Sequence, residues 1–176
     1  MLKQTPIALA VLCFSFSSAL FAGENKQAVE DSLPKKTSTA LSDISEDVLS
    51  KLQKHSPGFI PEEVEAESKH GNRYMDIEGK LPDGSEIEFD MLLDKGEWRI
   101  VEVQRDISLE ETPKTVLAEL KKGAANFKVD RIIESDQGDG VIIYEFFTIP
   151  DKGERIKREV KLQAGKAEFL EKEWQH

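Results

Sequence analysis

Residues 80–89 read KLPDGSEIEF and residues 148–157 read TIPDKGERIK, two Pro-Asp turns that each lead into an alternating run. Pro82 and Pro150 are 68 positions apart. The same offset relates four pairs of apolar residues: Val48 and Val116, Leu49 and Leu117, Leu52 and Leu120, Phe59 and Phe127. Self-similarity at one offset is typical of a supersecondary unit that is used twice. The sequence therefore predicts an internal repeat.

Two segments have the apolar spacing of an amphipathic helix. In residues 42–58, SDISEDVLSKLQKHSPG, apolar side chains recur every four residues and Pro57-Gly58 ends the pattern. In residues 112–127, TPKTVLAELKKGAANF, Thr112 suits the N-cap and Pro113 suits the first helical position. Each helix is expected to lead into a run of strands.

After each helix the apolar period changes to two, and glycine-bearing turns divide the chain, which predicts strands and hairpins. The expected strands are 59–68, 73–81, 86–93 and 98–104, followed by 128–135, 141–149, 155–162 and 167–174. The predicted fold class is α+β, a tandem repeat of one helix plus a four-stranded antiparallel meander, over residues 42–106 and 110–174. The two repeats should form one curved sheet, with both helices on one face and the other face open.

The N-terminus has the layout of a secretory signal peptide. Lys3 precedes an apolar run over residues 7–14, and small residues follow up to Ala22, so residues 1–22 are the expected signal peptide and export to the periplasm or medium is predicted. The apolar run is too short for a membrane span, so none is expected after cleavage. Residues 23–41 are polar and are expected to be a flexible linker, followed by one domain over residues 42–176. Cys13, the only cysteine, lies in the leader, which excludes disulfides and thiolate sites from the mature chain.

Charge is distributed unevenly along the predicted domain. Residues 45–104 contain fifteen acidic and seven basic side chains, whereas residues 112–174 contain twelve of each. The whole chain has a formal net charge of −10, which disfavours nucleic acid as a partner. The acidic first half can instead orient a basic protein partner.

No catalytic or metal site is predicted. The three histidines, His55, His70 and His176, have no spacing that would bring them together with carboxylates. The sequence DQGDG at 136–140 lacks the distal glutamate of a calcium loop and is interpreted as a hairpin turn. No nucleophile with a base partner and no phosphate-binding loop is found, so the chain is expected to be a non-enzyme without a cofactor.

Two groups of side chains are candidates for binding. In the segment VIIYEFFTI, residues 141–149, both faces are apolar, and Ile142, Tyr144 and Phe146 share one of them. These three either form an exposed aromatic patch that anchors a partner, or belong to a strand covered on both faces. In the first half, the carboxylates of an alternating acidic face are the second group, represented by Glu65, Glu88 and Asp90.

The segments VLSKLQKHSPGFIPEEVE and TVLAELKKGAANFKVDRII, with the hairpins after them, resemble the PepSY and PepSY-like group of small exported bacterial domains. The resemblance covers residues 42–174 and implies a fold similar to that of the beta-lactamase inhibitor protein. It also implies non-enzymatic binding, with inhibition or regulation of peptidases as the usual role. The motif has no fixed site, so no functional residue carries over. The second half departs from the pattern, with Ala124-Ala125-Asn126 in place of Ser56-Pro57-Gly58.

The leading hypothesis is an exported protein-binding module, an inhibitor or regulator of a peptidase or other envelope protein, that binds through its open sheet face. The alternative is an envelope protein that binds calcium-like cations on its acidic face. Saturable calcium binding would separate the two. The sequence predicts neither the partner nor the oligomeric state.

Overall fold

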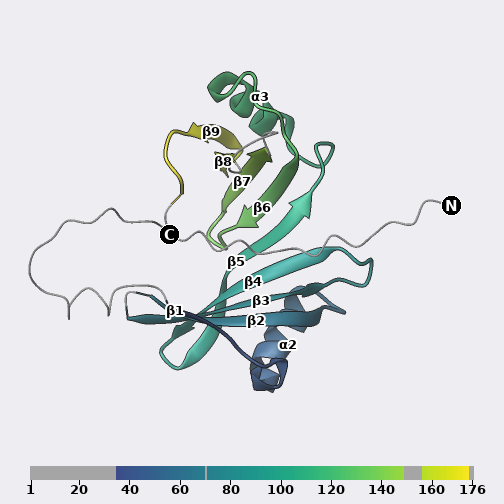
Figure 1. Cartoon of the computed structure of the whole chain (residues 1–176), viewed down its shortest axis with the longest axis vertical. Helices are drawn as coiled ribbons and strands as arrows, with labels where there is room; N and C mark the ends of the chain where they lie inside the picture. The colour runs from purple at the N-terminus through teal and green to yellow at the C-terminus, as the bar shows by residue number, and fades with distance from the viewer. Residues whose placement is uncertain (1–34, 70, 149–155, 175–176) are drawn as a thin grey trace, which may run out of the picture. The chain divides into compact units, whose positions relative to one another are not determined.

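The computed structural model describes residues 35–69, 71–148 and 156–174 (Figure 1). The predicted signal peptide lies outside these residues. The described strands form one antiparallel sheet in which each strand pairs with its neighbours in the chain. They are β1 Lys35–Ser38, β2 Ile60–Lys69, β3 Asn72–Lys80, β4 Glu86–Asp94, β5 Glu97–Ile107, β6 Arg131–Asp136, β7 Val141–Thr148, β8 Ile156–Gln163 and β9 Lys166–Leu170.

Two α-helices precede long stretches of the sheet, as the apolar spacing predicted. They are α2, Glu46–His55, and α3, Lys114–Gly123; a short 3-10 helix, η2, covers Leu41–Asp43. The hydroxyl of Ser45 caps α2 by accepting a hydrogen bond from the Val48 amide at 3.3 Å. Thr112 does not cap α3: its hydroxyl donates to the Ser108 carbonyl at 2.9 Å, and Pro113 occupies the N-cap.

Each helix buries its apolar stripe against a different part of the sheet. Val48 and Leu52 of α2 pack with a cluster whose other buried members are Phe59, Val64, Ile77, Ile87, Phe89 and Met91. Val116 and Leu120 of α3 pack with Ile107, Ile132, Tyr144, Phe146 and Val160. Complete burial of one such side chain stabilises the fold by about 1.5–3 kcal/mol, so these two clusters hold the helices on the sheet.

The predicted fold class is wrong. The described residues form a single nine-stranded antiparallel sheet with two short α-helices, not a tandem repeat of two helix-plus-meander units. Residues Val103–Arg105 of β5 pair with β4 on one side and with β6 on the other, so backbone hydrogen bonds run continuously along the sheet, and β1 adds a strand that neither predicted unit contained. The strands after α3 also have 5–8 residues, against 9–11 after α2, so the two halves are not equivalent.

The ninth strand comes from the predicted linker. Lys35–Ser38 pair with Glu65–Ser68 at the edge of β2, so these four residues are strand, not linker. Strand addition at an edge uses backbone groups, which explains why polar side chains gave no sign of it. Among the residues that the structure describes, no helix is long and apolar enough to cross a bilayer.

Candidate functional site

Carboxylates lie directly opposite one another across four neighbouring strands. Glu65 of β2 pairs with Asp76 of β3, Asp76 pairs with Asp90 of β4, and Asp90 pairs with Glu102 of β5. Glu88 of β4 stands opposite Glu78 in the same way. Like charges that face each other across strands destabilise a sheet, so this arrangement costs folding free energy.

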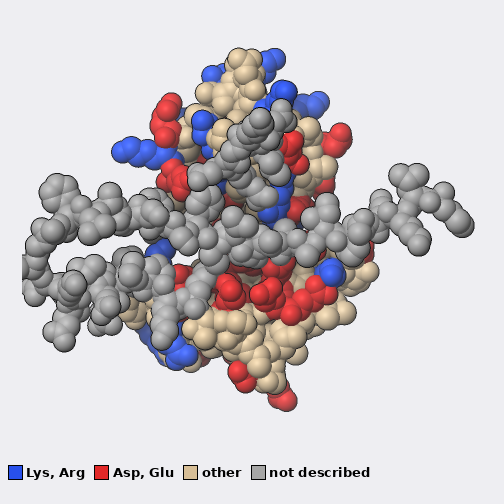
Figure 2. Space-filling view, viewed as in Figure 1, with Lys and Arg blue, Asp and Glu red and all other residues tan. Residues whose placement is uncertain are grey.

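The carboxylate row, defined as Glu65, Asp76, Glu88, Asp90 and Glu102, lies on the face of the sheet away from α2. Val64, Ile77 and Phe89 alternate with the acidic residues along β2, β3 and β4, and all three are buried in the α2 cluster. Because successive side chains in a strand point to opposite faces, the carboxylates must point the other way. Figure 2 shows acidic side chains gathered over the strands that Figure 1 labels β3 and β4.

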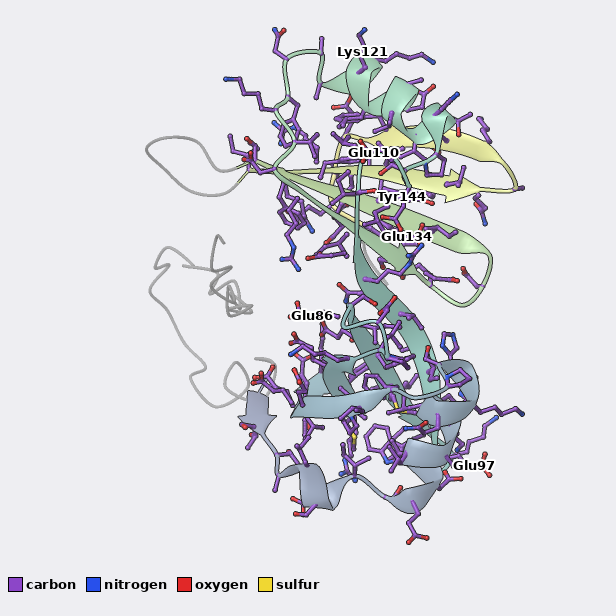
Figure 3. All side chains as sticks on the ribbon, turned by 90° about the vertical axis from the view of Figure 1, so that its right-hand side faces the viewer. Glu86, Glu97, Glu110, Lys121, Glu134 and Tyr144 are labelled. Atoms are coloured by element: carbon purple, nitrogen blue, oxygen red, sulfur yellow. The ribbon has the colours of Figure 1, made fainter. Side chains whose placement is uncertain are left out.

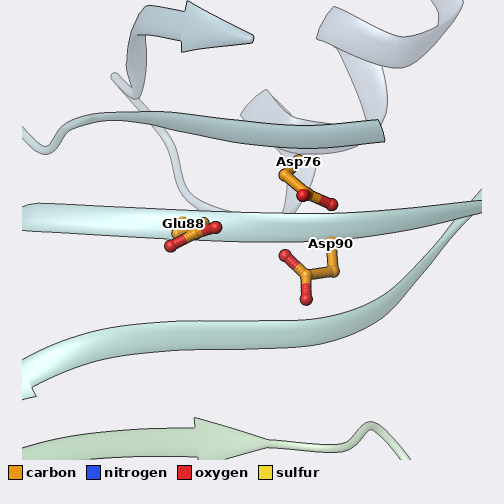
Figure 4. A group of neighbouring side chains, drawn as sticks. All are labelled: Asp76, Glu88 and Asp90. Atoms are coloured by element: carbon orange, nitrogen blue, oxygen red, sulfur yellow. The ribbon is translucent and has the colours of Figure 1, made fainter. Parts of the chain in front are cut away.

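Three of these carboxylates come close enough to share one ion. One oxygen each from Asp76, Glu88 and Asp90 can be chosen so that all three lie within 4.8 Å of one another (Figure 4). The three residues are partly buried. Two strands supply them, since Glu88 and Asp90 are alternate residues of β4 and Asp76 is the cross-strand partner of Asp90.

Asp90 is the most constrained member of this group. Its carboxyl group is buried, and Oδ1 is closed to solvent and accepts no hydrogen bond. Burial raises the pKa of Asp90 well above its ordinary value, and the negative charges of Glu102, Asp76 and Glu88 raise it further.

A bulge aligns the Asp90–Glu102 pair. Asp90 pairs with Glu102 but Met91 pairs with Ile100, so Val101 is an extra residue in β5. A bulge shifts the alternation by one position and re-aims the side chains beside it. Here it lets Met91 and Ile100 remain on the α2 side while Asp90 and Glu102 stay together on the other.

Polar contacts continue from Glu102 toward the end of the chain. Glu102 accepts hydrogen bonds from the Ser135 hydroxyl and, at 3.1 Å, from the side-chain amide of Gln137. The Trp174 indole donates to Gln137 Oε1 at 3.1 Å, and its backbone amide donates to Glu159 Oε2 at 2.6 Å. Trp174 therefore lies over this part of the sheet and links the C-terminal segment to Glu102 through Gln137.

Lys157 neutralises two carboxylates beside Trp174. Its ammonium nitrogen lies 2.9 Å from Glu145 Oε1 and 2.7 Å from Glu159 Oε1. Burial lowers the pKa of Lys157, but the two carboxylates outweigh burial and the net shift is upward. Burial raises the pKa of Glu145; the charge of Lys157 lowers it and offsets burial only in part, and the negative charge of Glu159 raises it further. The arrangement is one cation shared by two acids.

The predicted aromatic anchors lie in the core and not on an open face. Tyr144 is 2% exposed, Phe146 is fully buried, and both pack against α3; Ile142 packs at the edge of the same cluster. The Tyr144 hydroxyl donates to Glu134 Oε2 at 3.0 Å (Figure 3), and burial followed by this bond raises the pKa of Tyr144. Val141, Ile143 and Phe147, on the other side of β7, are buried as well. This strand is therefore covered on both faces, and no exposed patch exists there.

The predicted carboxylates Glu65, Glu88 and Asp90 do lie on one face, but sequence reasoning missed Asp76 and Glu102 as their partners. The turn at residues 81–85 carried a usable signal. A hairpin pairs residues at equal distances from its turn, so Asp76 should face Asp90 if Lys80 faces Glu86, as it does. Glu102 could not be found in this way, since the bulge at Val101 shifts the register of β5.

A scan against protein-family models found no match, and a search of curated proteins found no similar sequence either. The resemblance to PepSY-like domains therefore stays a prediction.

Stability is expected to fall as pH rises through the raised carboxyl pKa values. The pKa values of Asp90, Glu145 and Glu78 are all raised, chiefly by burial, from ordinary values of 3.8 for Asp and 4.5 for Glu. A carboxyl with a raised pKa keeps its proton in the folded state after the unfolded chain has lost it. The folded state then binds more protons, and the free energy of unfolding decreases with pH.

Asp90→Asn should flatten this decrease above about pH 4.5 and raise the stability at neutral pH by about 1–3 kcal/mol, since it removes a buried charge that pairs with no Lys or Arg among the described residues. Urea unfolding at several pH values, with a chelator present, measures both effects. Glu97→Gln, at an exposed position outside the carboxylate row, should keep the slope of the unchanged protein. An equal slope in Asp90→Asn would show that Asp90 does not titrate in this range.

Proposed function

We propose that this chain is an exported, non-catalytic protein-binding module that recognises a basic partner through its carboxylate row. The observation that carries the proposal is the row itself: Glu65, Asp76, Asp90 and Glu102 stand opposite one another on successive strands. Clustering side chains of one charge on a sheet face lowers the stability of the fold. Such an unfavourable arrangement is typical of a functional site. Binding of this kind suits an inhibitor or regulator of a peptidase or other envelope protein, the role that the resemblance implies.

The position of the row also supports a protein ligand. It lies on the sheet face opposite the α2 core, and its outer members Glu65 and Glu88 are partly exposed. Partly exposed carboxylates at an interface mainly accelerate association with a basic surface and make it dependent on salt. The buried aromatics of β7 take no part in this proposal.

The test compares partner capture by two variants with the same change in charge. Glu65→Gln/Glu88→Gln removes two charges from the row, whereas Glu97→Gln/Glu110→Gln removes two from exposed positions elsewhere (Figure 3). A basic envelope protein captured at low salt should associate about tenfold more slowly with the first variant and normally with the second. Equal association with both variants, or binding that does not respond to salt, would refute the proposal.

A further inference from the structure

We infer that Asp76, Glu88 and Asp90 form a binding site for one divalent cation of the calcium class. The site goes beyond the proposed function, because it needs no protein partner. It rests on two independent observations: the proximity of three carboxylate oxygens from β3 and β4, and the unsatisfied buried oxygen of Asp90.

The spacing of the three oxygens fits one ion. Calcium binds oxygen ligands at about 2.3–2.6 Å, so two oxygens on opposite sides of the ion are up to about 5 Å apart. The three oxygens of the site, all within 4.8 Å of one another, meet that limit. Waters can complete the six to eight ligands that calcium takes, since each of the three residues keeps some exposure.

The second observation concerns one oxygen of Asp90. Asp90 Oδ1 is closed to solvent and accepts no hydrogen bond, although buried polar atoms in proteins are nearly always paired. Among the described residues, no Lys or Arg forms an ion pair with Asp90, and the charged groups that act on it, Glu102, Asp76 and Glu88, are all acidic. A cation bound to this oxygen would supply its missing partner and would also offset the repulsion between Asp76 and Asp90.

The chemistry of the donors selects the class of ion. All three ligands are carboxylates, which are hard oxygen donors that suit calcium and magnesium and not the softer thiolate-binding metals. Magnesium demands near-ideal octahedral geometry at about 2.0–2.1 Å, whereas calcium tolerates irregular ligand sets. Two ligands from one strand and one from its neighbour form an irregular set, which favours calcium.

The experiment titrates calcium chloride into the chelator-treated protein by calorimetry and follows the melting temperature in parallel. Saturable binding of one ion is expected, with a Kd of about 10⁻⁴–10⁻³ M, the range of extracellular calcium modules. The melting temperature should rise with calcium concentration, because the ion binds the folded state. Magnesium should bind at least about tenfold more weakly.

Variants distinguish this site from general attraction to a negative surface. Asp90→Asn and Glu88→Gln should each weaken calcium binding at least about tenfold, whereas Glu97→Gln and Glu110→Gln should bind as the unchanged protein does. Glu88→Gln keeps the test decisive if Asp90→Asn perturbs folding, since Glu88 is partly exposed.

Absence of saturable binding up to about 10 mM calcium would overturn the inference. Calcium binding that is weakened equally by the site variants and by the control variants would also overturn it. Partner capture is measured in the presence of a chelator, so it does not depend on calcium binding. The failure of this site and the failure of the proposed function can therefore be told apart.

Discussion

Replacing Phe146 with alanine should lower the free energy of unfolding by about 3–5 kcal/mol. Phe146 of β7 is fully buried under α3, in the cluster that contains Val116, Ile132 and Val160. Removing the ring forfeits its burial and leaves a cavity that neighbouring strands cannot close, since β7 is hydrogen-bonded on both sides. Urea unfolding followed by circular dichroism measures the loss.

Leu109→Ala is the matched control, because Leu109 is a large apolar residue that is 48% exposed and its truncation should cost less than about 1 kcal/mol. Phe147→Ala, on the other side of β7, should also be clearly destabilising, because Phe147 is 8% exposed. A cost below about 1 kcal/mol for Phe146→Ala would contradict the placement of this ring in the core.

Replacing Lys157 with methionine should destabilise the protein by about 2–4 kcal/mol. The substitution keeps most of the side-chain volume but removes a cation that contacts both Glu145 and Glu159. Glu159 is 4% exposed, so its charge would be left buried and unpaired. Breaking a buried ion pair by removing one partner costs about 3–5 kcal/mol, and the partial exposure of Lys157 reduces that figure here.

A compensating change tests the cause of this loss. Glu145→Gln in the Lys157→Met background should restore part of the stability, because it removes one of the two charges that the lysine had neutralised. Lys161→Met is the matched control: Lys161 pairs at 3.2 Å with Glu168, whose side chain is 57% exposed, so the loss should be under about 1 kcal/mol. If the two lysine variants were equally stable, the shared-cation arrangement would be refuted.

The positions of the helices and of eight strands could be predicted from the sequence, because these depend on local patterns. Val48 and Leu52 recur at helical spacing, and the glycine-bearing turns mark where hairpins reverse. The same patterns predicted that Glu65, Glu88 and Asp90 would share a charged face, and the structure confirms that placement. Alternation within a strand is a property of the backbone and needs no knowledge of what packs on the sheet.

Only the tertiary structure decided how the strands join and what covers them. The offset of 68 residues had predicted two equivalent repeats, but the strands after α3 are shorter than those after α2, and β1 adds an edge strand through backbone groups alone. For Tyr144 and Phe146 the sequence left open an exposed patch or a strand covered on both faces, because both faces of β7 are apolar. The structure places both residues in the cluster under α3. Asp90 shows the same limit. Its position in the sequence predicts that it lies on a charged face. The burial of Oδ1 and the approach of Asp76 and Glu102 instead follow from strand register, from the bulge at Val101 and from packing between strands distant in the chain.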